Sequence, residues 1–147
     1  MILSTSATHI VNDLLQGELA ATETYQQALA QVGSEPGAED LRRLHVEHRE
    51  AANRLRQYVR DLGGKPSQSS QTWGAFAKAV EGWAKLFGNS AALKALKAGE
   101  ERGAATYEEA LTNEHLPKEF IEFLRATLLP QTRAHVEVLD RILQSAG

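Results

Sequence analysis

Two stretches of this chain, 82 residues apart, carry the same helical pattern. Residues 17–29 read GELAATETYQQAL and residues 99–111 read GEERGAATYEEAL. The positions that hold the same residue in both are Gly17/Gly99, Glu18/Glu100, Thr24/Thr106, Tyr25/Tyr107, Ala28/Ala110 and Leu29/Leu111. Apolar residues in both stretches recur at spacings of three, four and seven, which is typical of a helix with one buried face. The chain is therefore predicted to contain two related helices, each with a glutamate and a tyrosine on its buried face.

Each of these helices is predicted to begin an antiparallel hairpin. The first hairpin covers about residues 6–62. Its first helix runs from a cap at Thr5 or Ser6 to Val32, and its second runs from about Ala38 to a glycine stop at 63–64. The short segment between the two helices favours antiparallel neighbours.

The second hairpin is predicted to cover about residues 90–145. Ser90 is a good helix cap, and the helix that follows it ends near Thr112. Pro117 suits the first position of the last helix. Pro130 lies inside that helix, where it removes one backbone hydrogen bond, so we expect a kink there.

Residues 63–89 join the two hairpins and include a short amphipathic helix from about Trp73 to Phe87. We find no alternating segment that convincingly predicts a strand. The sequence thus predicts one all-α domain over residues 1–147, a ferritin-like four-helix bundle in which a long crossover replaces one short loop.

The composition limits the kinds of function. The net charge is -3 with no large single-sign excess, so a nucleic-acid partner is not indicated, because phosphate binding calls for clustered Lys and Arg. The chain has no Cys, so any metal would have to bind Glu, Asp and His. There is no secretory signal pattern and no apolar run of 18 residues, so we expect no membrane partner and a cytoplasmic location.

Glu18 and Glu100 lie in the middle of the two predicted buried faces. A buried lone carboxylate costs several kcal/mol, so each must be paired, protonated or bound to a cation. Candidate partners are His45 and His48, one turn apart on the second helix, and His135 on the fourth. Counted from the turn, Glu18 and His48 differ in height by about 6 Å, which leaves open whether they meet.

Di-iron sites in ferritin-like bundles take one Glu from each of two helices and a Glu-x-x-His pair from each of the other two. In this chain His45 and Thr132 stand where the glutamates of those pairs would be. The loss of two bridging carboxylates removes half of the anionic ligands of such a centre. A metal ion of iron, zinc or manganese remains compatible with the ligand types. The candidate ligands are Glu18, His48, Glu100, His135 and His45.

A hydrogen-bonded polar layer without a metal is the alternative. Tyr25 and Tyr107 lie two turns beyond their glutamates, from where a phenol can reach a histidine or a carboxylate across the bundle. Buried networks of this kind fix helix register when every member is satisfied. In either case the two tyrosines are expected next to the glutamates and histidines.

Several of these motifs together resemble a known family. They are the GE and Tyr of the first helix, RDLGGKP after the second, the Trp-containing crossover and, most specific of all, AGEERGAATYEEAL in the third. With them the chain resembles, from about Ile10 to Ile142, a bacterial family of ferritin-like four-helix bundles catalogued as a domain of unknown function. The resemblance implies a rubrerythrin-like or bacterioferritin-like bundle and supports Glu18 and Glu100 as its lone glutamates. It implies no activity.

Two functions are therefore open. The first is a metal-binding ferritin-like protein with a redox or stress-related role. The second is a non-catalytic interaction or structural module that displays a surface to a partner or to a second copy as a homo-oligomer. Trp73, Phe76, Trp83 and Phe87 favour it, because they exceed what a crossover helix needs to cover one side of a bundle. The sequence does not decide whether the protein is an enzyme, and no organic cofactor is indicated.

Overall fold

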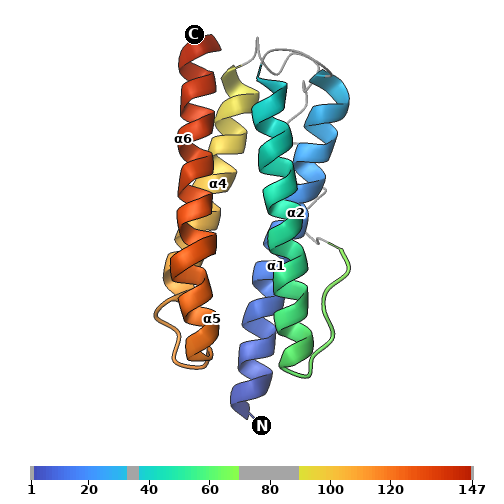
Figure 1. Ribbon diagram of the computed structural model, residues 1–147, viewed down its shortest axis with the longest axis vertical. Coiled ribbons are helices and arrows are strands. Elements are labelled where there is room, and N and C mark those ends of the chain that lie inside the picture. Colours follow the sequence, from blue (N-terminus) through green and yellow to red (C-terminus); the bar gives the residue numbers. More distant parts are fainter. Residues whose placement is uncertain (1, 33–36, 70–89, 147) are drawn as a thin grey trace.

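The computed structural model describes residues 2–32, 37–69 and 90–146 (Figure 1). Its helices are α1 Ile2–Val32, α2 Ala38–Asp61, α4 Ser90–Ala110, α5 Lys118–Phe123, the π-helix η2 Leu124–Leu128 and α6 Leu129–Ala146. No strand occurs within these three ranges. The prediction of an all-α fold with four long helices is confirmed, α5, η2 and α6 together forming the fourth. The helix predicted for Trp73–Phe87 lies outside the described residues.

The four long helices lie side by side, as Figure 1 shows. α1 packs along α2, and α4 packs along α6. α1 and the α5–α6 helix run one way along the bundle, while α2 and α4 run the other way (Figure 1). α2 therefore ends at the opposite end of the bundle from the start of α4.

Helix α1 begins at Ile2, so the predicted cap at Thr5 or Ser6 is wrong. Both residues lie inside the helix. Ser and Thr are favoured at helix starts because of their side-chain oxygens, but their cost inside a helix is small enough for it to continue through them.

Helix α2 ends as its glycines predict. Gly63 has φ 84°, a left-handed conformation that glycine adopts without strain. The Gly63 amide donates to the Arg60 carbonyl and the Gly64 amide to the Val59 carbonyl, both at 2.9 Å. These two bonds form a Schellman motif, which satisfies carbonyls at the helix end.

The residues after this motif lie against α1. Asn12 donates from Nδ2 to the Lys65 carbonyl at 2.9 Å and accepts at Oδ1 from the Ser67 amide, also at 2.9 Å. Gln16 Nε2 donates to Ser67 Oγ at 3.1 Å. The start of the connection is thus held along the first helix.

The fourth helix contains a π-helix, Leu124–Leu128, just before Pro130, and the kink expected at Pro130 stays a prediction. The Leu129 amide bonds the Leu124 carbonyl, five residues back. Pro130 has no amide hydrogen for the Ala126 carbonyl, and the exposure of Ala126 lets water take that place. A π-helix changes the register of the residues that follow, and such segments are frequent at functional sites.

The core consists of two apolar clusters separated by a polar layer. One cluster lies toward the end that holds the N-terminus and includes Val11, Leu15, Leu55 and Phe120. The other lies toward the opposite end and includes Leu41, Leu44, Leu93, Leu96 and Leu139. The buried polar residues Glu18, His48, Glu100, Thr132 and His135 fall between the two.

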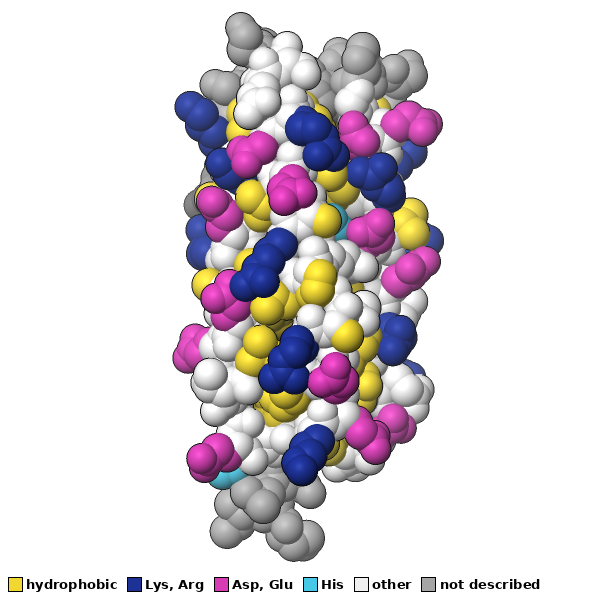
Figure 2. Space-filling model, turned by 60° about the vertical axis from the view of Figure 1, so that its left-hand side comes forward, with side chains coloured by type: hydrophobic (Ala, Val, Ile, Leu, Met, Phe, Trp, Pro, Cys, Tyr) yellow, Lys and Arg dark blue, Asp and Glu magenta, His cyan; other side chains and the backbone are white. Residues whose placement is uncertain are grey.

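On the face that Figure 2 shows, basic and acidic side chains are intermixed, with small hydrophobic areas between them. Lys97 pairs with Asp140 at 2.7 Å and Arg133 with Glu108 at 2.9 Å, so ion pairs join α4 to α6 at the surface. Within the described ranges, none of the helices combines the length and apolar content needed to cross a membrane.

Candidate metal centre

The four helices each contribute one buried glutamate or histidine to the polar layer. Glu18 comes from α1, His48 from α2, Glu100 from α4 and His135 from α6, and they are 6%, 4%, 4% and 2% exposed. Each lies on the apolar face of its helix, as the periodicity predicts. The structure therefore brings together these four sequence-predicted residues.

His48 lies between the two glutamates. Its Nδ1 is 2.6 Å from Glu18 Oε2, and its Nε2 is 2.7 Å from Glu100 Oε2. Burial lowers the pKa of His48, but the carboxylates of Glu100 and Glu18 outweigh burial and hold this pKa well above its ordinary value. Both ring nitrogens can then donate hydrogen bonds, because the imidazolium carries a proton on each.

His135 is also held between two carboxylates. Its Nδ1 is 3.3 Å from Glu100 Oε1, and its Nε2 is 2.7 Å from Glu47 Oε1. Glu47 is not among the residues predicted from the sequence, because it lies off the predicted buried face of α2. Only its position next to His48 could have drawn attention to it. Its side chain is 31% exposed and reaches from α2 to α6.

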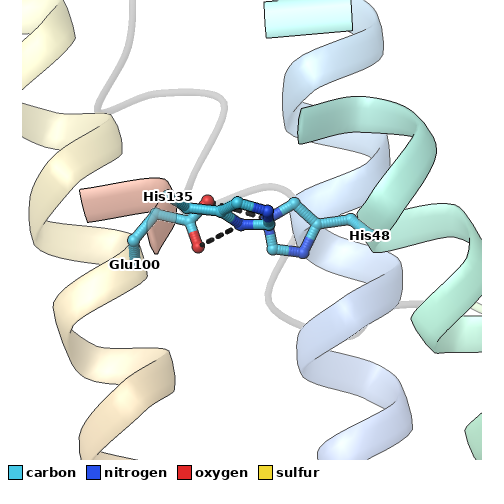
Figure 3. A group of neighbouring side chains, drawn as sticks. All are labelled: His48, Glu100 and His135. Carbon is cyan, nitrogen blue, oxygen red and sulfur yellow. Dashed lines mark hydrogen bonds and ion pairs between the residues drawn. The ribbon is translucent and has the colours of Figure 1, made fainter. Parts of the chain in front are cut away.

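Glu100 is the point at which the two histidines meet. One carboxylate oxygen faces His48 and the other faces His135 (Figure 3). The imidazole rings pack edge to face, with centroids 4.8 Å apart. Burial raises the pKa of Glu100, but the positive charge of His48 and the hydrogen bonds from both histidines outweigh burial, so this pKa lies well below its ordinary value.

The repeat-related tyrosines complete the layer, as predicted. Tyr25 donates to Glu100 Oε2 at 2.7 Å, and Tyr107 donates to Glu18 Oε1 at 2.5 Å. Tyr25 also stacks on His48, with ring centroids 5.3 Å apart. Burial and the neighbouring carboxylates raise the pKa of both phenols well above the ordinary value, so both stay protonated donors.

Three of these side chains are arranged so that they could hold one ion. His48, Glu100 and His135 each offer a ligand atom, and the three atoms lie within 4.8 Å of one another. Metal–nitrogen bonds of about 2.0–2.1 Å put two ligands of one ion at most about 4.2 Å apart, so only a small inward movement is required. Two imidazoles and a carboxylate suit zinc, iron or manganese.

Two of the candidate ligands, Glu18 and His45, do not belong to this three-residue group. Glu18 faces the second nitrogen of His48, so the imidazole ring lies between Glu18 and Glu100. His45 is half-buried one turn before His48 and is not part of the three-residue group. Burial and the charges of Arg49 and His48 lower the pKa of His45. A ligand role for Glu18 or His45 stays a prediction.

Thr132 occupies the place of the second glutamate on α6. It is buried, and its hydroxyl donates to the Leu128 carbonyl at 2.8 Å. Thr132 is therefore bonded to its own helix. The carboxylate that hydrogen-bonds His135 Nε2 comes instead from Glu47 on α2.

Comparison with protein families shows the family to which the chain belongs. Residues 6–113 match the family described as a domain of unknown function, DUF2383, and the chain belongs to this family. The matched range contains Glu18, Glu47, His48 and Glu100, and His135 lies beyond it. No curated protein and no solved structure matches the chain.

Proposed function

We propose that this protein binds one divalent transition-metal ion in the middle of a ferritin-like bundle, through His48, Glu100 and His135. One observation carries the proposal. Each histidine faces Glu100 with one ring nitrogen and a separate carboxylate with the other, Glu18 for His48 and Glu47 for His135. Histidines that bind metals usually donate their second N–H to such a carboxylate, which fixes the tautomer and the ring orientation.

The donor set suggests the class of ion. Two histidines and one carboxylate match zinc and non-haem iron, and manganese is acceptable to the same ligands. Three protein ligands leave coordination positions open, which is typical of reactive rather than purely structural sites. A redox role, such as protection against oxidative stress, would follow if the ion is iron or manganese, whereas zinc has no redox chemistry.

The surrounding side chains orient the ligands, and the ligands release protons when the ion binds. Glu18 and Glu47 orient the two imidazoles, and Tyr107 in turn orients Glu18. His48 must lose a proton from Nε2 before that nitrogen can bind an ion, so metal binding releases a proton. When bound, the ion would act as a Lewis acid or a redox centre, depending on its identity.

The helix directions support the ferritin-like part of this proposal. α1 and α6 run opposite to α2 and α4, and α2 and α4 run the same way (Figure 1). Two hairpins with one long connection have this arrangement in ferritin-like folds. The glutamates of α1 and α4 and the histidines of α2 and α6 then face one another at mid-height.

Metal stoichiometry tests the proposal. Purified protein would be loaded separately with Fe²⁺, Zn²⁺ and Mn²⁺, freed of excess metal and measured by elemental analysis. We expect about one ion per chain for at least one metal. Glu100→Gln should abolish retention, while Glu101→Gln, on the exposed neighbouring position, should retain the ion. Retention well below one ion per chain for all three metals would refute the proposal.

A structural role is the second candidate, because the same side chains satisfy one another within the chain. Glu18, His48, Glu100, Tyr25 and Tyr107 are linked by hydrogen bonds. Such a layer fixes helix register without any ion. It predicts the same stability with and without added metal, whereas a bound ion stabilises the folded state and raises the melting temperature.

A further inference from the structure

A cavity of about 300 Å³ lies between α1 and α4 and reaches the polar layer. The side chains of Glu18, Glu100 and His48 contribute to its lining, together with both repeat-related tyrosines. Its other walls come mostly from small residues of α1 and α4, together with Asp13, Leu14, Leu96, Arg102 and, from α6, Thr132. The cavity therefore reaches two of the three proposed ligands, His48 and Glu100, from the α1–α4 side, away from Glu47.

Glycines of α1 and α4 line this space. Gly17 and Gly99 occupy equivalent positions in the repeat, directly before Glu18 and Glu100, and both line the cavity. A Cβ placed on Gly17 would meet nothing within 4 Å, and one on Gly103 would only touch Thr132, at 3.7 Å. Gly17 is exposed and Glu18 is buried, and both line the cavity. The cavity therefore extends from an exposed residue to a buried carboxylate.

The walls and floor of the cavity differ in charge. Thr24, Thr106 and Thr132 line it, and each donates its hydroxyl to a carbonyl of its own helix. They therefore offer little to retain a polar molecule. The floor carries the carboxylates of Glu18 and Glu100 beside the His48 imidazolium, and the rest of the lining holds one acidic and one basic side chain, Asp13 and Arg102. A recess with negative charge at its base attracts cations.

We propose that this cavity is the path by which a hydrated divalent cation reaches His48 and Glu100, an inference that rests on the proposed function. Six waters of about 30 Å³ each occupy about 180 Å³, which the cavity can hold. The glycine that precedes each glutamate in the repeat provides the opening, and the glutamate provides the charge. The alternative path runs past the partly exposed Glu47, between α2 and α6.

A plug in the cavity tests this path. Gly17→Leu places a large side chain at the opening without touching a proposed ligand, and it favours the helix. Ala105→Leu, on an exposed position of α4 outside the cavity, is the matched control. Binding of Co²⁺ alone would be followed by visible absorbance in a stopped-flow instrument, and its release by mixing with excess chelator. Thermal melts check that both variants fold.

We expect Gly17→Leu to slow association by about tenfold, a barrier increase of about 1.4 kcal/mol, and Gly17→Ala to slow it less. Because the plug leaves the bound state unchanged, dissociation should slow by the same factor and Kd should stay constant. The control should bind at the unmodified rate.

An unchanged rate in Gly17→Leu with normal affinity would overturn the proposed path but not the proposed function, and it would favour entry past Glu47. Absence of binding in the unmodified protein, by Co²⁺ and by the elemental analysis above, would overturn the proposed function as well. If Gly17→Leu misfolds, Ala21→Leu, at another position of the cavity lining, decides in its place, and an unchanged rate in that variant would overturn the path.

Discussion

Tyr25 on α1 donates its phenolic hydrogen to Glu100 on α4, 75 residues further along the chain, at 2.7 Å. Tyr107, its equivalent in the second repeat, donates back to Glu18 in the first. Each repeat thus supplies the phenol that the glutamate of the other repeat requires. The two bonds join the hairpins across the bundle, where α1 and α4 make few other contacts.

Removal of either phenol should destabilise the protein. Tyr25→Phe and Tyr107→Phe each take one hydrogen bond from a buried carboxylate, at a cost of about 1.5–3 kcal/mol in the free energy of unfolding. Urea denaturation measures this change. Tyr58→Phe is the control, because the ring of the third tyrosine is partly exposed and packs on Phe120 and Phe123. If either buried variant proves as stable as Tyr58→Phe, its hydrogen bond contributes little.

The stability of the metal-free protein should fall as the pH rises above 6.5. The folded state raises the pKa of His48, so the stabilisation is complete below the ordinary value of 6.5 and is lost as the pH passes through the raised pKa. The slope can reach about 1.4 kcal/mol per pH unit for one proton.

Denaturation curves at intervals from pH 6.5 to 9.5, with a chelator present, measure this slope. The range lies above the ordinary pKa of His45, whose lowered pKa affects stability only at lower pH. It also lies far above the lowered pKa of Glu100, whose stabilisation is lost only in strong acid. An NMR titration of the imidazoles is the control and should show that His48 loses its proton only above pH 6.5. A flat stability profile would contradict the prediction.

Metal affinity should depend on Glu47. Loss of the carboxylate that holds the second nitrogen of a metal-binding histidine typically costs about 10- to 100-fold in affinity. We therefore expect Glu47→Gln to raise the Kd for the retained metal by about this factor, measured by competition with a chelator of known affinity. Glu50→Gln is the control, because Glu50 is an exposed glutamate of the same helix. Equal affinities in the two variants would exclude an orienting role for Glu47.

Gly64→Ala should destabilise the contact between α1 and the end of α2. A Cβ at this position would collide with the Thr8 methyl and press on Val59, and such overpacking typically costs about 1–3 kcal/mol. Thr8→Ser removes that methyl and should restore part of the loss. Gly17→Ala, in open space within a helix, should instead stabilise the protein by about 0.5–1 kcal/mol. Denaturation midpoints of the four proteins check the order.

Local patterns were sufficient to predict the four long helices and the burial of Glu18, Glu100, His48 and His135. Spacings of three and four define a buried face without knowledge of the neighbours. The 6 Å difference in height did not prevent contact between Glu18 and His48, since both side chains extend well beyond the backbone and meet at 2.6 Å. The glycine stop of α2 was likewise predictable, because it depends only on adjacent residues.

Features that depend on contacts between distant helices were not predictable. Glu47 reaches His135 only because α2 lies close to α6, and nothing in the spacing of α2 indicates this. The ring nitrogens that face Glu100 and Glu18 are set by the same packing. Pro130 predicted a disturbance in the fourth helix, but the π-helix before it depends on how the helix turns back to the core.

The exchange of phenols between the repeats also constrains how the chain could have arisen from a shorter one. A single ancestral hairpin would have left its own glutamate without a phenol, because the tyrosine two turns away points to a different chain segment. Two copies related by a twofold axis would have satisfied both glutamates at once, with Tyr25 of each copy on Glu18 of the other. The present chain has this exchanged pairing between its two hairpins.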